Sequence, residues 1–336
     1  MNLNALTRAL VDIESITDHE GQVGSYLYDL LSQIASKTGG RVEKMEVGPE
    51  RFNVLACWGE PLVTLSTHMD TVPPFFPSRE DSEFIWGRGA CDAKGIIASM
   101  VVAAEELLGQ NIRRFALLFV VGEERNSAGA AVAAQTPRGS KYLVNGEPTE
   151  SKLALASKGT LRFELVARGK MAHSAYPELG DSAIEALLDA LEAIRKVPLP
   201  RDSLLGPSTM NIGTISGGRA PNVVADAAKA EILVRMVGDA APVREALARA
   251  VGRRAQLIEV LFIPPIHFLS VDGMPTTVVS FTTDVPVFGR SWGEPLLLGP
   301  GSIHVAHTEN ERISKRELSE APEMYANVVK SLLARP

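Results

Sequence analysis

Histidine and carboxylate side chains recur in this chain at the points where short apolar runs end. They are His68 and Asp70 after the run 62–67, Glu123 and Glu124 after 115–121, Glu147 after 141–144, and His304 and His307 after 295–298. Each run has the length and composition of a buried strand. In an open α/β sheet the ligand crevice lies outside the carboxyl ends of the strands. Side chains that are far apart in the sequence are therefore predicted to meet at one edge of a sheet.

The residue types in this set are typical of a metal site. Imidazole and carboxylate ligands without thiolate suit Zn²⁺, and they also suit Co²⁺ and Mn²⁺. Two cations held close together need a carboxylate between them to offset their repulsion. Asp92 is the candidate, in the string Gly87-Arg-Gly-Ala-Cys-Asp-Ala-Lys-Gly95. The glycines allow this loop to turn sharply before the helix that follows.

Two short spacings suggest which residues ligate a metal and which assist them. His68 and Asp70 are two residues apart, so in extended backbone they lie on one side of the chain. We expect the Asp70 carboxylate to accept the second imidazole N–H of His68 and fix its tautomer. Glu123 and Glu124 are adjacent, so their side chains point apart. One can ligate a metal while the other stays free as a base.

Each of these residues has a simpler interpretation when it is taken alone. A Glu-Glu pair is often a solvated face, Glu147 could be a loop charge, and His307 could cap the helix after it. The joint pattern, with every residue at a strand end, favours a metal site. His304 fits no ligand position, and we expect it to be exposed.

The residues between these points predict the elements that must position them. Apolar residues at three- and four-residue spacing indicate helices over 3–38, 94–108, 128–135 and 315–333. These helices alternate with the strand-like runs. Such alternation predicts an α/β fold with a mixed, mainly parallel sheet flanked by helices.

From about residue 158 the pattern changes. Strand-like stretches at 161–167, 208–216, 229–236 and 255–262 are interrupted by helical stretches at 181–196 and 242–251. The order β-α-β-β-α-β is the ferredoxin-like pattern. We therefore predict a metal-binding domain in two parts, 1–157 and 264–336, with a small α+β domain inserted at 158–263.

Length and composition exclude several classes of protein. The 336 residues exceed the ~250–300 at which single cores stop growing. Hydrophobic residues at 45% and charged residues at 22% exclude a disordered chain, a collagen and a coiled coil. The net charge of −6 gives no footprint for nucleic acid, and two cysteines exclude a disulfide framework. No apolar run approaches the roughly 20 residues of a membrane span. We expect a cytoplasmic protein without nucleic-acid or membrane partners.

Several longer strings surround the candidate residues. They are Ser66-Thr-His-Met-Asp-Thr-Val-Pro73, Gly87-Arg-Gly-Ala-Cys-Asp-Ala-Lys-Gly95, Gly122-Glu-Glu124, Gly146-Glu-Pro-Thr149, Gly169-Lys-Met-Ala-His-Ser-Ala-Tyr-Pro177, Gly217-Gly-Arg-Ala-Pro-Asn-Val-Val224 and Gly299-Pro-Gly-Ser-Ile-His-Val-Ala-His-Thr-Glu-Asn-Glu311. Together they resemble the motifs of the co-catalytic zinc deacylases and peptidases. That family includes acetylornithine deacetylase, succinyl-diaminopimelate desuccinylase and carboxypeptidase G. The resemblance covers nearly the whole chain.

The resemblance implies a metal set and a fold. It implies a zinc-exopeptidase-like domain with two Zn²⁺ ions per subunit, and Co²⁺ or Mn²⁺ are the alternatives. The residues that match the family's ligand positions are His68 and Glu147 for one ion, Glu124 and His307 for the other, and Asp92 for the bridge.

It also implies roles for residues that do not bind metal. Glu123 matches the general base, with Asp70 behind His68. In the family the inserted domain is a lid that often mediates dimers. His173 matches a lid histidine that reaches the partner subunit's active site and stabilises the oxyanion. Asn222 and Arg235 match positions that hold a substrate carboxylate or acyl oxygen, although Asn222 could be a turn residue and Arg235 an exposed charge.

The string at 299–311 also carries a substrate contact and a departure from the family. Gly301 is expected among the substrate-binding residues. The usual Gly-Pro-Gly-Asp is Gly-Pro-Gly-Ser302 here, which removes one acidic side chain near the site. Ala225 replaces a usual proline, and the chain is short for the family. None of these departures involves a predicted metal ligand.

The predicted function is a metal-dependent amidohydrolase. It would remove the acyl group from an N-acyl-L-amino acid with metal-activated water and Glu123 as the base, most like acetylornithine deacetylase. Alternatives within the family are a desuccinylase, a dipeptidase or a carboxypeptidase acting on short peptides. A non-catalytic binding relative is the alternative from another class. A homodimer through the lid is compatible with the pattern.

Overall fold

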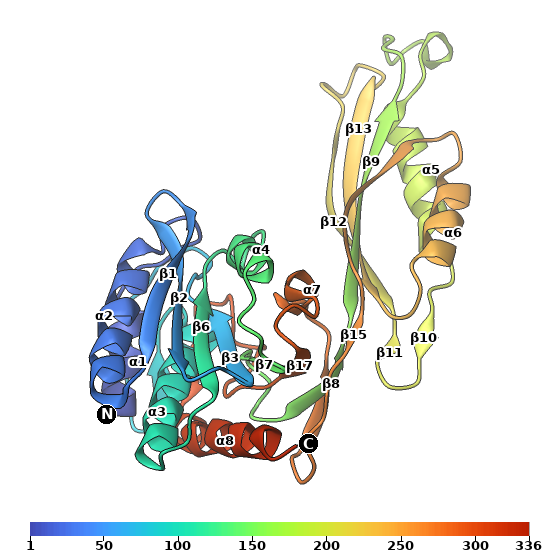
Figure 1. Ribbon diagram of the computed structural model, residues 1–336. Helices are drawn as coiled ribbons and strands as arrows, with labels where there is room; N and C mark the ends of the chain where they lie inside the picture. Colours follow the sequence, from blue (N-terminus) through green and yellow to red (C-terminus); the bar gives the residue numbers. More distant parts are fainter. Residues whose placement is uncertain (336) are drawn as a thin grey trace. The chain divides into compact units, whose positions relative to one another are not determined.

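The computed structural model describes residues 1–335 of the chain (Figure 1). Contacts divide it into two compact units. The first comprises Met1–Leu155, Phe268–Thr277 and Thr283–Pro336, and the second comprises Ala156–His267 and Val278–Thr282. The division into domains at 157/158 and 263/264 stays a prediction. Within residues 1–335, no helix combines the length and the apolar character needed to cross a membrane.

A mixed sheet forms the centre of the first unit. Its strands lie in the order β1-β2-β6-β3-β7-β17, and the sheet continues through β8 and β15. The neighbours β6, β3, β7 and β17 are parallel, whereas β1, β2 and β8 pair antiparallel. The strand bounds are β1 Arg41–Gly48, β2 Arg51–Trp58, β3 Val63–His68, β6 Phe115–Val120, β7 Tyr142–Asn145, β8 Leu153–Ser157, β15 Ile266–His267, β16 Thr276–Val279 (paired with β8) and β17 Glu294–Leu297. The predicted α/β fold class with a mainly parallel sheet flanked by helices is confirmed.

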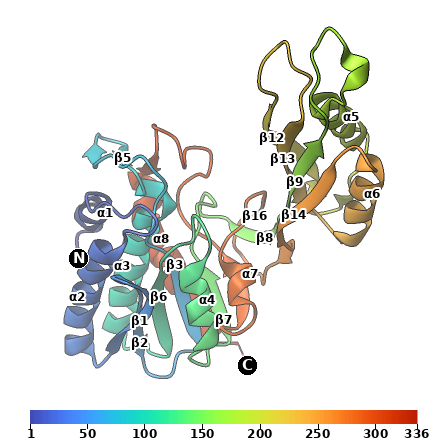
Figure 2. The ribbon, with the colours of Figure 1, turned by 90° about the horizontal axis from the view of Figure 1, so that it is seen from above.

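Helices cover both faces of this sheet because its strands are apolar on both faces. On β2, Val54 and Ala56 face one core, and Leu55 and Cys57 face the other. Helices α1, α2, α3 and α8 contribute to the first core, and α4 and α7 to the second (Figure 2). The helix bounds are α1 Leu3–Val11, α2 Gly21–Thr38, α3 Gly95–Gly109, α4 Ala128–Gln135, α7 Val285–Phe288 and α8 Lys315–Leu333.

The single helix predicted over 3–38 is wrong. The chain leaves helical structure after Val11 and resumes it at Gly21. The intervening residues hold the loop that follows β3: the Ser15 hydroxyl donates to the carbonyl of Met69 at 2.8 Å, and the Thr71 amide donates to the carbonyl of Ser15 at 2.9 Å. These long-range hydrogen bonds replace the helical ones, which periodicity alone cannot indicate.

A small sheet supports the loop that carries Asp92. Its strands are β4 Arg79–Glu80, β5 Phe84–Trp86 and β18 Arg312–Ser314, in the order β18-β5-β4. The irregular turn η1 spans Ala90–Lys94, between β5 and α3. Ile85 and Ile313 pair across this sheet, and both lie in one cluster with Cys91. Cys91 is thus a buried part of the packing beneath Asp92.

The second unit has the element order β-α-β-β-α-β, and the strand order β12-β13-β9-β14 is antiparallel throughout. Its elements are β9 Gly159–Arg168, the short turn η2 Pro177–Leu179, α5 Ala183–Arg195, β10 Arg201–Asp202, β11 Gly206–Pro207, β12 Thr209–Gly217, β13 Ala227–Met236, α6 Ala241–Val251 and β14 Gln256–Ile263. This is the ferredoxin-like arrangement.

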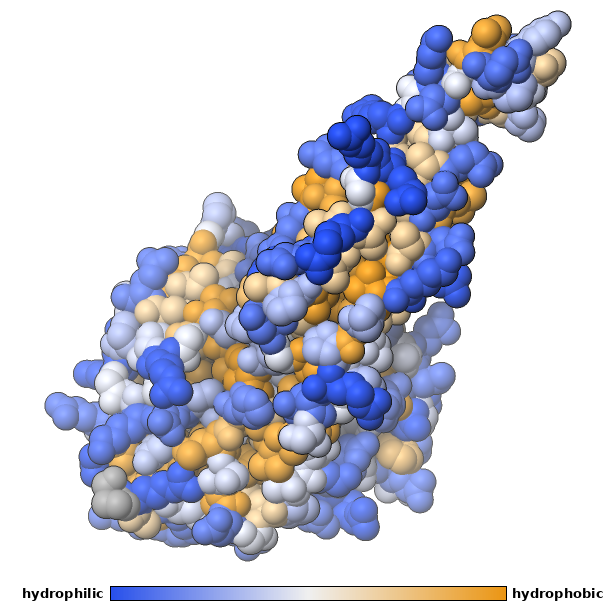
Figure 3. All heavy atoms as spheres, turned by 90° about the vertical axis from the view of Figure 1, so that its right-hand side faces the viewer, coloured by the Kyte–Doolittle hydropathy of each residue, from blue (hydrophilic) through white to orange (hydrophobic). Residues whose placement is uncertain are grey.

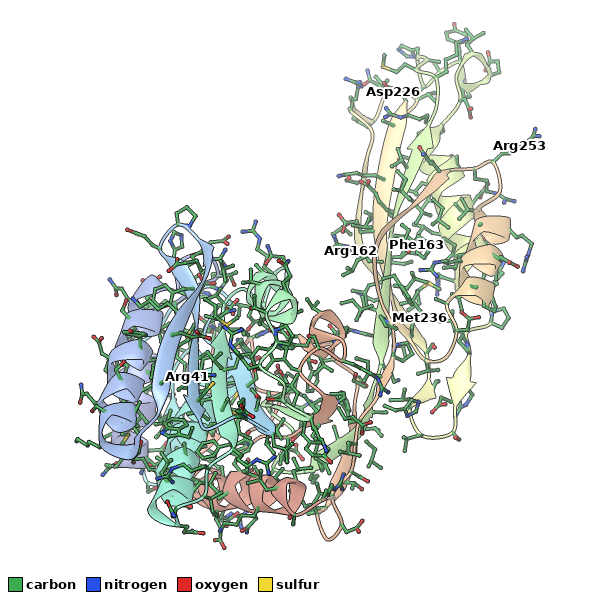
Figure 4. The ribbon with its side chains drawn as sticks, in the orientation of Figure 1. Arg41, Arg162, Phe163, Asp226, Met236 and Arg253 are labelled. Atoms are coloured by element: carbon green, nitrogen blue, oxygen red, sulfur yellow. The ribbon has the colours of Figure 1, made fainter. Side chains whose placement is uncertain are left out.

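One face of the second unit's sheet is covered and the other is open. Leu161, Phe163 and Leu165 of β9 lie in a buried cluster with residues of α5 and α6. Figure 4 shows Arg162 and Phe163 on opposite sides of β9. The open face therefore carries Thr160, Arg162 and the other even-numbered residues of β9.

Candidate metal centre

Strands β3, β6 and β7 end side by side, as the sequence predicts. His68 lies opposite Val120 in the β3–β6 pair, and Ser66 lies opposite Asn145 in the β3–β7 pair. The residues that follow these strands therefore leave the sheet at one edge. They include Glu123 and Glu124 after β6, and Glu147 after β7.

His68, Asp92 and Glu124 form the centre of the site. One candidate ligand atom from each lies within 4.8 Å of the other two. Oδ1 of Asp92 is 2.9 Å from Nε2 of His68, and Oδ2 of Asp92 is 3.3 Å from Nε2 of His307. The same His307 nitrogen lies 2.9 Å from Oε1 of Glu124. Each oxygen of Asp92 thus faces a different imidazole, which is the arrangement that a bridging carboxylate requires.

Glu147 lies beside this centre without belonging to its closest group. Its carboxylate accepts a hydrogen bond from Nδ2 of Asn145 at 3.3 Å, and the residue is 4% exposed. The pKa of Glu147 is raised well above its usual range by burial, and nearby His68 opposes that effect. This interaction places Glu147 in the electrostatic neighbourhood of His68.

The charges of the site fit divalent cations. Burial raises the pKa values of Glu123 and Glu124, whereas hydrogen bonds from His307 and His68 outweigh burial and lower the pKa of Asp92. Hydrogen bonds to Asp92 and Glu124 raise the pKa of His307 to about 10. The acidic groups crowded here are thus balanced only by protons and imidazolium charge. Divalent cations with imidazole and carboxylate ligands would replace those protons.

Asp70 fixes the loop that carries the two glutamates. Its Oδ1 accepts from the amide of Glu123 at 3.0 Å, and its Oδ2 accepts from the amide of Glu124 at 3.2 Å and from the Thr17 hydroxyl at 2.7 Å. The side chains of Glu123 and Glu124 differ in their contacts. Glu124 contacts His307, while the carboxyl group of Glu123 has no hydrogen-bond partner identified in residues 1–335. This leaves Glu123 available to handle a proton.

The tautomer of His68 is set differently from the expectation. Its Nδ1–H donates to the main-chain carbonyl of Asp70 at 3.0 Å, and the Asp70 carboxylate lies further away, at 3.6 Å. The Asp70 carboxylate accepts hydrogen bonds from the amides of Glu123 and Glu124 instead. With Nδ1 held by this carbonyl, Nε2 is the ring nitrogen that faces Asp92 and that would ligate a metal.

A buried ion pair behind Asp92 was missed from the sequence. Arg88 Nη1 donates to Oε2 of Glu311 at 2.5 Å, and both side chains are almost inaccessible. Oε1 of Glu311 accepts from the amides of Gly89 at 2.9 Å and Asp92 at 3.3 Å. Glu311 therefore holds the backbone that carries the bridging residue. It ends the 299–311 string, but a single glutamate after His307 has no spacing that would single it out.

A second missed residue is Asp284, which precedes α7. Its carboxylate is buried, and neither oxygen has a hydrogen-bond partner in the described part of the chain. The Ser127 hydroxyl lies nearby without reaching hydrogen-bond geometry. Burial raises the pKa of Asp284 to about 7, and it acts electrostatically on Glu123 and Glu147. A lone aspartate in a loop gives no sequence signal for such a position.

We expect Asp284→Asn to stabilise the metal-free protein at pH 8 and to leave its stability nearly unchanged at pH 4. The folded state keeps a proton on Asp284 up to about pH 7, whereas the unfolded chain releases it near 3.8. The stability that this group contributes is therefore lost as pH rises between these values, roughly 4 kcal/mol in total. Urea titrations of chelated protein at both pH values measure the free energy of unfolding. A variant that is destabilised at pH 8 contradicts the expectation.

The predicted lid residues fall into two places within the second unit. His173 and Asn222 lie together: His173 pairs with Val223, and the Ser174 amide donates to the Asn222 carbonyl at 3.0 Å. Nδ1 of His173 accepts from the Ala175 amide at 3.1 Å, which leaves Nε2 of this exposed residue as the nitrogen that can donate to a ligand. Arg235 lies near the other end of β13. The eight steps from Ala227 to Arg235 span about 26 Å at ~3.3 Å per residue.

Gly301 uses both of its main-chain polar groups inside the chain. Its N–H donates to Oε2 of Glu317 at 2.8 Å, and its carbonyl accepts from the Glu150 amide at 2.8 Å. Its φ is +92°, and a Cβ there would lie 2.8 Å from Cβ of Cys91. Backbone conformation and packing thus require glycine at position 301. Ser302 donates to Glu150 at 3.1 Å, and His304 is exposed as expected.

Sequence comparison finds a family match over most of the chain. Residues 64–331 match the model of peptidase family M20/M25/M40. A peptidase M20 domain-containing protein of Schizosaccharomyces pombe is 38% identical, over 98% of this chain and 84% of its own. A probable carboxypeptidase of Aspergillus flavus is 39% identical, over 97% of this chain and 89% of its own.

Solved structures share the fold at lower identity. Aminopeptidase PepT from Bacillus cereus superimposes with a TM-score of 0.82 at 22% identity, and 98% of each chain is covered. An M20 family metallo-carboxypeptidase from Sulfolobus solfataricus gives 0.78 at 17% identity over 99% of each chain. With the family model and the relatives above, these similarities confirm the predicted family: the chain is a hydrolase that belongs to peptidase family M20/M25/M40.

Proposed function

We propose that this protein is a metal-dependent carboxypeptidase that releases a C-terminal amino acid from a short peptide or an N-acyl amino acid. The observation that carries the proposal is the Asp92 carboxylate, whose two oxygens face His68 and His307 at 2.9 and 3.3 Å. A metal pair bridged in this way is a hydrolytic centre. The printed names of several relatives at 36–39% identity, probable carboxypeptidase, support the choice of substrate.

The proposed ligands are those expected from the sequence. His68 and Glu147 would hold one ion, Glu124 and His307 the other, and Asp92 would bridge them, with Zn²⁺ as the working ion and Co²⁺ or Mn²⁺ as alternatives. When bound, such ions polarise the scissile carbonyl and lower the pKa of a shared water. Glu311, paired with Arg88, holds the Asp92 amide, which would keep the carboxylate in place to ligate the metal.

Glu123 is the proposed proton carrier. Its carboxyl group sits among the ligands, and burial raises its pKa well above the usual range. It would accept a proton from the attacking water and deliver it to the leaving amine. Asp70 contributes by holding the Glu123 amide at 3.0 Å, which positions the carboxyl group relative to His68.

Arg235 is the proposed partner of the substrate's terminal carboxylate. It has no ion pair in the described part of the second unit, and its Nη1 donates to the Thr160 hydroxyl at 2.8 Å. A forked guanidinium without a protein carboxylate is suited to bind one from a ligand. The need for a free C-terminal carboxylate on the substrate distinguishes a carboxypeptidase from an endopeptidase.

His173 and Asn222 are proposed to serve the active site of a second copy. They lie beyond the Ala227 end of β13, which is about 26 Å from Arg235, so one small substrate cannot touch all three residues of one chain. Most of the large hydrophobic side chains that are exposed in residues 1–335 belong to the second unit, among them Ile212 and Ile215 of edge strand β12. Figure 3 shows hydrophobic patches between the charged residues on this unit. These features support a homodimer formed through the lid.

Co-expression of His173→Ala with Glu123→Gln tests the shared site. Each variant alone is expected to be inactive, because each lacks one residue of every site. In a mixed dimer one site receives an intact Glu123 from one chain and an intact His173 from the other. Activity should recover to about a quarter of wild type for random pairing. No recovery in a mixture shown by ultracentrifugation to contain dimers contradicts the shared site.

A deacetylase is the second candidate. The string Gly146-Glu-Pro-Thr149, with glutamate as the ligand, resembles the deacetylase and desuccinylase branch. The names of the relatives favour the carboxypeptidase, so acetylornithine deacetylase becomes the alternative. Both reactions hydrolyse the amide bond to the nitrogen of an amino acid. Both would use the same metal ligands and the same proton carrier, Glu123.

A substrate panel separates these candidates. Protein loaded with Zn²⁺ or Co²⁺ is offered N-acetyl and N-succinyl amino acids, dipeptides and N-blocked dipeptides, with chelated protein as the blank. We expect turnover of peptides with a free C-terminal carboxylate and none of the corresponding C-terminal amides. Arg235→Gln should raise KM by about 10- to 100-fold. Equal turnover of acids and amides contradicts the carboxypeptidase, and turnover confined to N-acetyl amino acids favours the deacetylase.

A further inference from the structure

Arg162 is a second arginine on the open face of the second unit's sheet, and it lies next to Arg235. In the β13–β9 pair Arg235 is opposite Thr160, and Leu233 is opposite Arg162. The two arginines are therefore diagonal neighbours on adjacent strands. Such positions are about 7–8 Å apart, which long side chains span easily.

Both guanidinium groups point away from the buried core. The residues that alternate with them, Leu161 and Phe163 on β9 and Val234 on β13, lie in the cluster under α5 and α6. The hydrogen bond from Arg235 to the Thr160 side chain confirms that Arg235 shares a face with the even-numbered residues of β9. Arg162 is one of these residues, and Figure 4 shows it on the side of β9 opposite Phe163.

Neither arginine has an acidic partner in the described chain. Burial is the cause that lowers the pKa of Arg235, and no carboxylate opposes it. Nε of Arg162 is buried and has no hydrogen-bond acceptor. Two acids share this face: Glu164 pairs with Lys229 at 3.6 Å, and Glu231 is a diagonal neighbour of Arg162 but forms no ion pair with it in the described chain. Two adjacent guanidinium groups without a carboxylate partner indicate a missing anionic ligand.

We infer that Arg162 and Arg235 together form a subsite for two carboxylates, which selects substrates whose C-terminal residue is acidic. The terminal carboxylate would lie on Arg235, as in the proposed function on which this inference rests. The side-chain carboxylate of a glutamate or aspartate would lie on Arg162. Guanidinium groups match carboxylates in geometry as well as charge, so both contacts add specificity.

Matched peptide substrates test the preference. N-blocked dipeptides ending in glutamate, glutamine or leucine are compared for the wild-type protein, for Arg162→Gln and for Arg168→Gln. Arg168 lies on the same face of β9 but is exposed, so it controls for loss of charge. Arg162→Gln should lower kcat/KM for the glutamate peptide by about 10- to 100-fold, mostly through KM, and leave the other two within about twofold. The control should change none of them.

Two kinetic outcomes would overturn the inference. Equal losses on glutamate and glutamine peptides assign Arg162 a structural role. A wild-type protein that shows no preference for glutamate over glutamine removes the subsite itself, while a KM effect of Arg235→Gln would leave the carboxypeptidase proposal standing.

Binding of a product-like anion separates this inference from the reaction. Glutarate and butyrate are titrated into wild-type protein and Arg162→Gln, with binding read by ligand-detected NMR. We expect glutarate to bind at least about tenfold more tightly than butyrate, and Arg162→Gln to abolish the difference. This result would support the subsite even if no peptide on the panel is hydrolysed. Equal affinities in the wild-type protein would overturn it whatever the activity.

Discussion

Glu123→Gln is expected to abolish turnover while leaving bound metal unchanged. Glutamine has the size of glutamate but cannot accept the proton of the attacking water or return it to the leaving amine. Because one residue would act as both base and acid, we expect kcat to fall by about 10³- to 10⁴-fold. The Asp70 contact to the main-chain amide of residue 123 does not involve the side chain, so the loop should keep its place. Steady-state kinetics and metal analysis of the same sample make the measurement.

The neighbouring residue provides a matched comparison. Glu124→Gln makes the same chemical change one position along, but it removes the carboxylate that lies 2.9 Å from His307. We therefore expect it to lose metal as well as activity. Glu106→Gln, an exposed change on α3, should alter neither. If Glu123→Gln keeps wild-type turnover, or if it loses metal like Glu124→Gln, Glu123 is not the proton carrier.

Asp92→Asn is expected to have the largest effect on the metal centre. The carboxylate lies between His68 and His307, and an amide of the same size cannot offer a negatively charged oxygen to each side. Two cations would then face each other without the charge that offsets their repulsion. We expect metal affinity to fall by more than about 100-fold and activity to be lost with it. Calorimetric titration of chelated protein with Zn²⁺ measures the first effect.

A second readout of Asp92→Asn does not depend on metal. Hydrogen bonds to Asp92 and Glu124 raise the pKa of His307 to about 10 in the metal-free protein. Removal of the larger contribution, that of Asp92, should move this pKa back toward 6.5, which NMR titration of the imidazole detects. An unchanged pKa of His307 would show that Asp92 does not interact with it. Unchanged metal affinity would reject Asp92 as the bridge.

The fold was largely predictable because its signals are local. The apolar runs at 62–67 and 115–121 became β3 and β6, and the predicted helix 315–333 became α8 with the same bounds. The ferredoxin-like order of the second unit followed from alternation within single strands. The failure at residues 3–38 is instructive. Ser15 and Thr17 leave the helix because they bond to the loop of Met69 and Asp70, more than 50 residues away.

For the site, the sequence by itself determined which donors were present and at which strand ends they stood. That is enough to predict a metal centre, since parallel strands bring their carboxyl ends to one edge. Only the tertiary structure decided the distances. It placed Asp92 between two imidazoles. It also showed that the Asp70 carboxylate accepts from the amides of Glu123 and Glu124, and that Glu311 accepts from the amide of Asp92.

Only the tertiary structure likewise shows which residues around the metal centre and the proposed substrate site matter. Asp284 and Arg162 carry no motif, and their significance lies in the partners that they lack inside the folded chain. Arg235 and Asn222 stand only 13 positions apart in the sequence, yet the extended strand β13 separates them by most of its length. Spacing along the chain reports local geometry, because backbone sterics act between near neighbours. Burial, pairing and charge balance depend on contacts between distant residues, and only the folded chain determines them.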